Sequence, residues 1–151
     1  APVLKNDEGE RVSGYFMRFN RSKRSITLNL KDPHGKEIYK QLAAESDVVI
    51  DNLRPGAMDK LGLGYSDLEP LNPGLIYVSI SGFGETGPYA GKPVYDPLVQ
   101  ALSGLTTVQA GSDKTRPRLV RTILPDKLSG YAAAPDAGRL PSFSAFSVRP
   151  G

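Results

Sequence analysis

Two aspartates are the residues of this sequence best suited to chemistry. Asp126 follows Pro125 where a helix is expected to begin, and Asp96 precedes Pro97 in the run Val-Tyr-Asp-Pro. The free N–H groups and the dipole at a helix N-terminus keep a carboxylate ionised, and an ionised carboxylate can act as a nucleophile. An ordinary N-cap residue occupies the same position. The pattern alone therefore leaves a structural and a catalytic interpretation of Asp126 open.

Two loops carry residue types that bind anions. One is Asn52-Leu-Arg-Pro-Gly56 and the other is Ser81-Gly-Phe-Gly-Glu-Thr-Gly87, and each follows an expected strand. In open parallel sheets, ligands sit beyond the carboxyl ends of the strands. There Arg54 would pair with a phosphate, and the glycines would let backbone N–H groups approach it. Tight turns also require glycine, so a purely structural interpretation of both loops stays open.

The glycine spacing of the second loop imitates a dinucleotide-binding site. Gly82, Gly84 and Gly87 match the G-x-G-x-x-G fingerprint after a strand. That fingerprint requires a helix to begin at its third glycine, which Pro88 and Pro93 oppose. No acidic residue ends a second strand about twenty positions later. We therefore do not expect the chain to bind NAD.

Other common chemistries lack their residues. The chain has no cysteine, which excludes a disulfide framework, a thiolate metal site and a cysteine nucleophile. Its one histidine, His34, has no partner for a metal site. Neither a Ser-His-Asp set nor a nucleophile elbow is present in the sequence. We expect no metal centre.

The elements that would position these residues alternate between strands and helices. Residues 25–30 alternate apolar and polar side chains, which predicts a strand. Asp32 and Pro33 then predict the capped start of a helix that runs to about Ser46. Residues 47–51 form an apolar run between two acids, which is typical of a strand buried on both faces. This order predicts a right-handed βαβ unit.

The same alternation continues along the chain. We expect short helical pieces at residues 56–61 and 65–71, a third buried strand at 75–80 and a helix at 94–102. A polar loop at 109–118 and a short extended run at 119–124 would follow, and another helix would begin at Pro125. Residues 1–24 show little periodicity. Pro135 is expected to stop the last helix after about two turns, and 135–151 form an aperiodic tail. The fold class is α/β, with a parallel sheet and flanking helices.

Composition and charge narrow the classes of partner. The chain has 151 residues, 39% hydrophobic and 23% charged, which fits one domain. No apolar run is long enough to cross a membrane, and the polar N-terminus differs from a signal peptide, so we expect a cytoplasmic protein. The net charge is +3, and the positive charge is concentrated in two basic clusters. Such clusters suit phosphate-bearing partners, or they form a solvated face. The first cluster is Arg18, Arg21, Lys23 and Arg24, and the second is Lys114, Arg116, Arg118 and Arg121.

Three stretches, in this order and spacing, resemble the family III CoA-transferases. This group includes formyl-CoA transferase and carnitine CoA-transferase, with α-methylacyl-CoA racemase as a relative. The stretches are residues 20–30, 47–62 and 72–88, and the match continues through Tyr95-Asp96 and residues 119–127. The resemblance covers residues from about 14 to 134.

The resemblance implies a fold, a partner state and a reaction. The family has a Rossmann-like large domain and a small domain, in an interlocked homodimer. The matching Asp126 would attack an acyl-CoA thioester to give an aspartyl acyl anhydride and CoA thiolate. The thiolate would return to form an aspartyl-CoA thioester, from which a carboxylic acid collects CoA. Acyl-CoA and the acid are substrates, and no cofactor is permanently bound.

The resemblance also assigns binding residues. The matching CoA site includes Lys23, Lys60 and Leu61, and Arg54 lies in the same loop. Tyr95 and Asp96 match positions near the reacting thioester. Arg54 keeps its alternative interpretation as an exposed charge.

Departures from the family pattern qualify these expectations. The family's first strand–helix unit, its small domain and the glycine-rich loop that covers the aspartate have no counterpart here. We therefore expect residues 1–134 to be part of the large domain, with 135–151 outside the family pattern, and the isolated chain to be inactive.

Three other interpretations compete with this one. A racemase of this superfamily pairs histidine with aspartate, but Tyr95 stands at the histidine position and tyrosine is a weak base near neutral pH. A nucleic-acid-binding module is disfavoured because the basic clusters lack interleaved aromatic residues. A non-functional remnant stays open.

Overall fold

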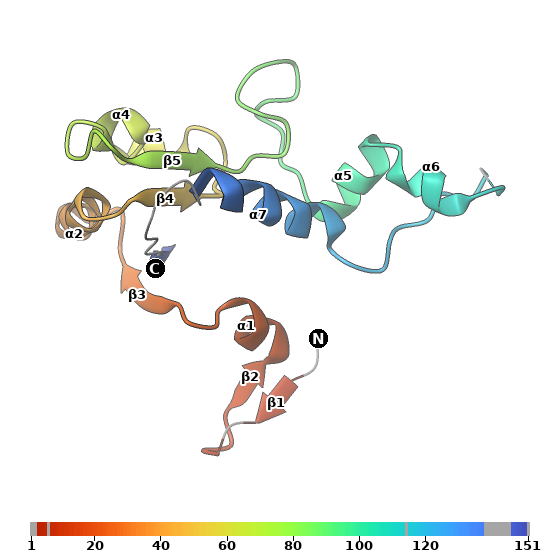
Figure 1. Cartoon of the computed structure of the whole chain (residues 1–151), viewed down its shortest axis with the longest axis horizontal. Coiled ribbons are helices and arrows are strands. Elements are labelled where there is room, and N and C mark those ends of the chain that lie inside the picture. Colours follow the sequence, from red (N-terminus) through yellow and green to blue (C-terminus); the bar gives the residue numbers. More distant parts are fainter. Residues whose placement is uncertain (1–2, 6, 114, 138–145, 151) are drawn as a thin grey trace.

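A small parallel sheet lies at the centre of the fold. In a computed structural model, which describes residues 3–5, 7–113, 115–137 and 146–150, β4 (Val48–Asp51) pairs in parallel with β5 (Ile76–Ser79). The connection between them runs through two short helices, α3 (Ala57–Leu61) and α4 (Tyr65–Leu68). Figure 1 shows both helices on one side of the sheet. These four elements agree with the sequence prediction.

Helix α2 (Pro33–Ala44) begins at the predicted cap. Asp32 Oδ1 accepts from the backbone N–H groups of His34 and Gly35 at 2.8 and 3.4 Å. A Cβ at Gly35 would lie 2.2 Å from the Asn29 carbonyl oxygen, so only glycine fits where the helix meets the preceding turn. The helix contributes to one core cluster formed by Leu30, Tyr39, Ala43, Met58, Leu63, Leu68 and Leu75.

The predicted βαβ unit is wrong in its strand pairing. β3 (Arg24–Leu28) pairs in parallel with β6 (Phe146–Pro150), and β4 belongs to a different sheet. β6 lies in the stretch expected to be aperiodic. Phe146 and Val148 alternate with polar residues in the sequence, which is a strand signal too short to outweigh the surrounding proline and glycine.

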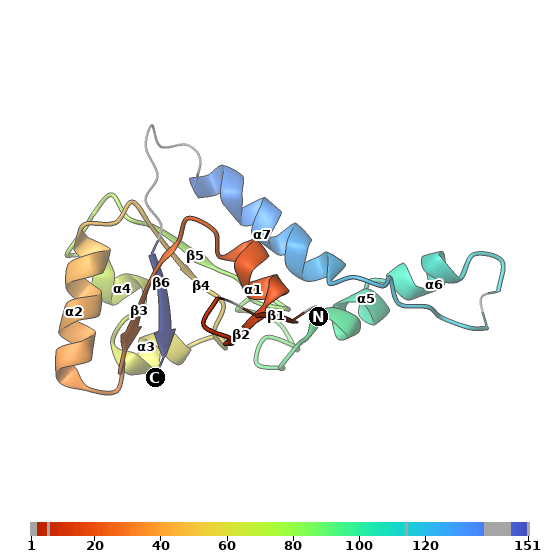
Figure 2. The same ribbon diagram turned by 90° about the horizontal axis from the view of Figure 1, so that it is seen from below.

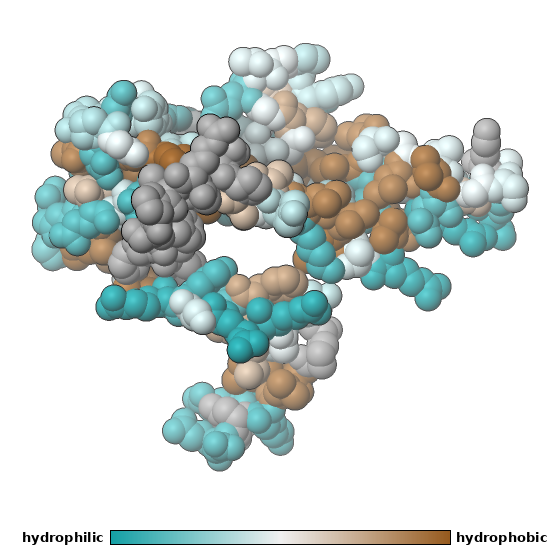
Figure 3. All heavy atoms as spheres, in the orientation of Figure 1, coloured by the Kyte–Doolittle hydropathy of each residue, from teal (hydrophilic) through white to brown (hydrophobic). Residues whose placement is uncertain are grey.

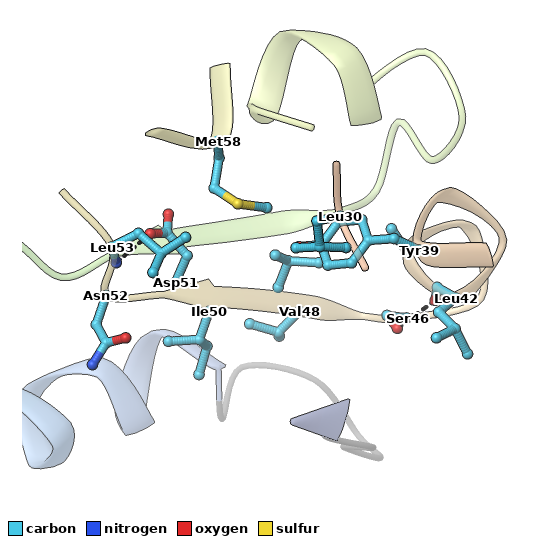
Figure 4. A pocket seen from close by; sticks show the side chains of 12 residues that line it. Leu30, Tyr39, Leu42, Ser46, Val48, Ile50, Asp51, Asn52, Leu53 and Met58 are labelled. Carbon is cyan, nitrogen blue, oxygen red and sulfur yellow. Dashed lines mark hydrogen bonds between the residues drawn. The ribbon is translucent and has the colours of Figure 1, made fainter. Parts of the chain in front are cut away.

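The predicted burial of β4 on both faces is also wrong. Val48 is buried, but Ile50, two residues along on the same face, is 48% exposed. Figure 4 shows Ile50 pointing away from Met58 and toward the side where α7 (Leu124–Ala137) lies. One face of β4 packs on the core through Val49 and Leu53, and the other is only partly covered.

The first part of the chain forms a projecting unit that the sequence did not predict. β1 (Val3–Lys5) and β2 (Arg11–Ser13) pair antiparallel. α1 (Gly14–Phe19) follows β2 directly. In Figure 1 this unit extends away from the central sheet.

Three helices complete the described chain. α5 (Asp96–Leu102) matches its prediction closely, and it packs on both α6 (Leu105–Ala110) and α7. α6 was not predicted. Residues 119–124 do not form the expected extended strand. α7 continues through Pro135 to Ala137 and is longer than predicted, so Pro135 lies in its last turn and does not end the helix. Figure 2 shows α7 crossing beside β4 and β5.

Candidate active site

A cavity of about 580 Å³ lies at the carboxyl ends of β4 and β5. Four segments line it: residues 52–55 after β4, 80–82 after β5, 92–96 at the start of α5, and the first turns of α7. The sequence predicts that Asp126, Tyr95 and the loop Ser81–Gly87, called here the glycine loop, meet at this edge. The structure brings all three to the cavity, together with Arg54 and Asp96.

Asp126 is the third residue of α7, not its N-cap. The helix begins at Leu124, and Asp126 is the acidic residue of the first turn. Its backbone N–H donates to Asp96 Oδ2 at 3.3 Å. The side chain that accepts a hydrogen bond from a free N–H at the start of this helix is therefore that of Asp96. The side chain of Asp126 is exposed and lines the cavity. This corrects the N-cap interpretation, although the first turn still favours a negative charge.

Asp96 is a buried carboxylate with both oxygens engaged. It is 6% exposed, at the first position of α5. Oδ1 accepts from Gln100 Nε2 at 2.5 Å, and Oδ2 accepts from the Asp126 N–H. Burial of a carboxylate is costly unless hydrogen bonds satisfy it. Asp96 therefore links α5 to the start of α7.

Gln100 is a site residue that the sequence analysis missed. It is 1% exposed, and its Oε1 accepts from the Val120 N–H at 2.8 Å. Its Nε2 also lies 3.3 Å from the Thr122 carbonyl oxygen. The signal in the sequence was the spacing of Asp96 and Gln100, because residues four apart share one face of a helix.

The glycine loop is built as a turn. Gly84 has φ 74° and its N–H donates to Ser81 Oγ at 3.0 Å, so this N–H is used within the loop. Gly87 also has a positive φ, of 93°. A Cβ at Gly82 would lie 1.7 Å from Val94 Cγ1. The backbone conformation at Gly84 and Gly87 and the close packing at Gly82 each require glycine, so the structural interpretation of the loop accounts for all three.

Two basic side chains and an exposed tyrosine line the cavity. Arg54 and Lys92 bring positive charge, and Tyr95 is 78% exposed. The sequence analysis did not identify Lys92. Its Nζ lies 4.1 Å from the ring centroid of Tyr89, within the range of a cation–π interaction. Tyr89 packs in turn against Phe83, with ring centroids 5.5 Å apart. These contacts restrain Lys92 beside the cavity.

Three predicted CoA-binding residues are not among the side chains that line this cavity. Lys23 lies in the turn before β3, where its N–H donates to the Asn20 carbonyl at 3.4 Å. Lys60 is in the last turn of α3. Leu61 packs against the core cluster. Their role in binding CoA stays a prediction.

A second, smaller cavity belongs to the core. It has about 150 Å³ and lies between α2, β4 and α3, lined mainly by apolar side chains (Figure 4). Its carboxylate, Asp51, accepts from the Leu53 N–H at 2.8 Å and from the Tyr77 hydroxyl at 2.9 Å. Burial, with the nearby charge of Asp51, raises the pKa of Tyr39 to about 12. The larger cavity therefore holds the residues available for chemistry.

Two further features of the described residues bear on function. Within ranges 3–5, 7–113, 115–137 and 146–150, no group of three or more His, Cys, Asp or Glu side chains is arranged to hold a metal ion. In the same part of the chain, no helix combines the length and apolar character needed to cross a bilayer.

Comparisons with known proteins agree in one family. The family described as CoA-transferase family III matches residues 2–137. The chain is 46% identical over 116 residues to acetyl-CoA:oxalate CoA-transferase of Acetobacter aceti, covering 77% of this chain and 30% of that protein. It is 42% identical over 123 residues to human succinyl-CoA:glutarate CoA-transferase, covering 80% of this chain and 28% of that protein.

The fold is shared with solved structures. A CAIB/BAIF family protein from Brucella suis superposes with a TM-score of 0.75 at 36% identity, covering 96% of this chain and 40% of that one. Rv3272 from Mycobacterium tuberculosis, in its orthorhombic form, gives a TM-score of 0.76 at 30% identity, covering 98% of this chain and 42% of that one. The chain thus spans less than half the length of these relatives.

Proposed function

Because the chain belongs to CoA-transferase family III, we propose that it carries the nucleophile of a CoA-transferase and that Asp126 is that nucleophile. The observation that carries the proposal is the placement of Asp126. Its side chain lines the 580 Å³ cavity from the first turn of α7, and its backbone is held by Asp96. A volume of this size lies within the range of pockets for small ligands, roughly 300–1,000 Å³.

The Asp126 carboxylate is the nucleophile of the first step and is released again in the last step. It attacks the thioester carbonyl of an acyl-CoA, and the tetrahedral oxyanion collapses to expel CoA thiolate and leave an aspartyl acyl anhydride. The thiolate then attacks the aspartyl carbonyl of the anhydride. This step releases the donor acid as its carboxylate and leaves an aspartyl-CoA thioester.

The acceptor acid reverses these two steps. Its carboxylate attacks the aspartyl-CoA thioester and expels CoA thiolate, which gives a second anhydride. The thiolate attacks the acceptor carbonyl of that anhydride, which forms the new acyl-CoA and frees the Asp126 carboxylate. Atoms and charges balance over the cycle without an added oxidant or reductant.

We infer that the acids are small and carry a second carboxylate. The relatives are named for oxalate, glutarate and succinyl-CoA. In this chain Arg54 and Lys92 line the cavity that contains Asp126, and such cations stabilise carboxylates by charge-assisted hydrogen bonds. On the family resemblance, we also propose that Lys23, Lys60 and Leu61 contribute to CoA binding, that Tyr95 lies near the thioester, and that the whole protein is an interlocked homodimer.

The test is a single-turnover experiment with an acyl-CoA. The whole protein that contains this chain is mixed with succinyl-CoA and quenched, and the aspartyl thioester is reduced with borohydride before peptide mass spectrometry. We expect the modification on the peptide that contains Asp126, and its loss in Asp126→Asn. The matched control is Asp7→Asn, at an exposed aspartate between β1 and β2. Modification that persists in Asp126→Asn would assign the nucleophile to another residue.

A further inference from the structure

A buried glutamine connects α5 to the segment that leads into α7. Gln100 is 1% exposed, and its carboxamide bonds three groups. Nε2 donates to Asp96 Oδ1 at 2.5 Å and to the Thr122 carbonyl oxygen at 3.3 Å. Oε1 accepts from the Val120 N–H at 2.8 Å. Both amide hydrogens and one oxygen lone pair are therefore used.

The same bonds reach Asp126 through Asp96. Because Gln100 engages Oδ1 of Asp96, the other oxygen is oriented to receive the Asp126 N–H at 3.3 Å. The backbone is therefore held on both sides of the start of α7, at residues 120–122 by Gln100 and at Asp126 by Asp96. We call Gln100 and Asp96 together the α5 clamp.

We propose that Gln100 is a positioning residue for the reaction of Asp126: through the α5 clamp it sets where the backbone of Asp126 lies at the cavity. This inference rests on the proposed function of Asp126. Gln100 does not line the cavity and acts only through Asp96 and the backbone. Small displacements of a reacting group are costly, since about 1 Å of misplacement can reduce a rate roughly a hundredfold.

A glutamine is required because the clamp needs donors and an acceptor at once. An ionised glutamate introduced at this position would offer no donor to Asp96 and would place two carboxylates in hydrogen-bond contact. Because neighbouring like charges raise the pKa of a carboxyl group, such a pair takes up a proton as the pH falls. When protonated, the introduced carboxyl group donates to Asp96 and still accepts from the Val120 N–H. A methionine fills a similar volume but makes neither bond.

This difference gives a test with a pH signature. In the whole protein that contains this chain, the rate of adduct formation at Asp126 is measured under single turnover for the native sequence, Gln100→Glu, Gln100→Met and the exposed control Gln109→Met. We expect the ratio of the Gln100→Glu rate to the native rate to rise about tenfold between about pH 8 and pH 5.5, as the added carboxyl is protonated. The ratio for Gln100→Met should stay low and flat, and Gln109→Met should match the native chain.

The comparison is made as a ratio because other charged residues lie near the clamp along the chain. These are Asp126 and Lys127 on α7, and Arg121 just before α7. They are present in every variant, so the ratio cancels their contribution. The acyl-CoA concentration at half-saturation should change little in all variants, because Gln100 lies outside the cavity. A Gln100→Met rate equal to the native rate, or a flat pH ratio for Gln100→Glu, would overturn the proposal.

A second readout needs no activity. Amide hydrogen exchange at Val120 and Asp126 should be faster in Gln100→Met than in the native chain, while exchange in α2 stays unchanged. If the native whole protein forms no adduct, the proposed function fails, and the exchange result still decides the clamp: unchanged protection at both amides overturns it. If Gln100→Met does not fold, exchange protection at Val120 and Asp126 is measured in Gln100→Glu over the same pH range. Protection that does not increase as the pH falls would overturn the proposed clamp.

Discussion

The two carboxylates at the cavity, Asp96 and Asp126, differ in whether their oxygens are engaged in hydrogen bonds within the protein. Both oxygens of Asp96 accept hydrogen bonds inside the protein, and the residue is buried. Asp126 presents an exposed carboxylate to the cavity, and its backbone N–H is held by Asp96. A nucleophile must keep a lone pair accessible to the substrate. At the scale of residues, Asp96 is therefore suited to positioning and Asp126 to reaction.

Lys92 gives a prediction at the same scale. In the protein that contains this chain, Lys92→Met should raise the half-saturating concentration of a dicarboxylic acceptor about tenfold, since a hydrogen bond to a charged group contributes about 1.5–3 kcal/mol. A monocarboxylic acceptor of similar size should be little affected. Steady-state kinetics with succinate and butyrate measure the difference, and the exposed Lys31→Met is the control. Equal losses for both acids would contradict a role in recognising the second carboxylate.

At the scale of elements, the loop Ser81–Gly87 packs closely against the segment that leads into α5. A Cβ at Gly82 would lie 1.7 Å from Val94 Cγ1. We expect Gly82→Ala to destabilise the chain by about 1–3 kcal/mol through overpacking, as measured by urea unfolding. Adding Val94→Ala should recover part of this loss, because it removes both contacted methyl groups but keeps the Val94 Cβ, which lies 2.6 Å from the added Cβ.

The matched control for this contact is Gly91→Ala. Gly91 lies between this loop and α5, and a Cβ there would meet no atom within 4 Å. Its substitution should leave the unfolding midpoint nearly unchanged. A double variant no more stable than Gly82→Ala alone would show that Val94 is not the cause.

The core beneath β4 gives a prediction about alkaline stability. Tyr39 has a pKa of about 12 in the folded chain, against an ordinary value of 10.0, and burial also raises the pKa of Tyr77. A raised folded-state pKa contributes stability that is fully present below the unfolded pKa and is lost as pH rises through the folded pKa. The free energy of unfolding should therefore fall between about pH 10 and pH 12.

Tyr39→Phe isolates that contribution. The variant should show a shallower fall over the same pH range, because one of the groups that must ionise is removed. Urea unfolding at closely spaced pH values measures the slope. Tyr131→Phe, at a tyrosine that is 77% exposed, should leave it unchanged. A slope in Tyr39→Phe identical to that of the native chain would assign the pH dependence to other groups.

Local signals in the sequence predicted the elements better than their pairing. Asp32 and Pro33 marked the start of α2 because a cap depends on neighbours within three residues. The pairing of β3 with β6 joins residues more than a hundred positions apart, and loop spacing alone does not specify it. The location of the cavity was predictable because ligand sites follow the carboxyl ends of parallel strands. The role of Gln100 was only partly predictable: its spacing from Asp96 is a local signal, but its partners Val120 and Thr122 come from a distant segment.

At the scale of the whole molecule, one side is unusually apolar. Figure 3 shows hydrophobic residues gathered on the side where α5, α6 and α7 lie. Among the exposed apolar side chains of these helices are Leu98, Leu102, Val108, Leu128 and Tyr131. We call these five residues the α5–α7 patch. Contiguous apolar surface of this kind is uncommon on a soluble monomer and marks a surface prone to association.

We expect the isolated chain to self-associate through the α5–α7 patch. Sedimentation velocity should show a mass that grows with protein concentration and is insensitive to salt, because apolar contacts are not screened. The triple variant Leu102→Ser, Val108→Ser and Leu128→Ser should reduce this association. None of the three lines the 580 Å³ cavity, so in the whole protein the same substitutions should not lower the yield of adduct at Asp126. If association weakens strongly with salt and is unchanged in the triple variant, the charged clusters would be responsible instead, because salt screens electrostatic attraction.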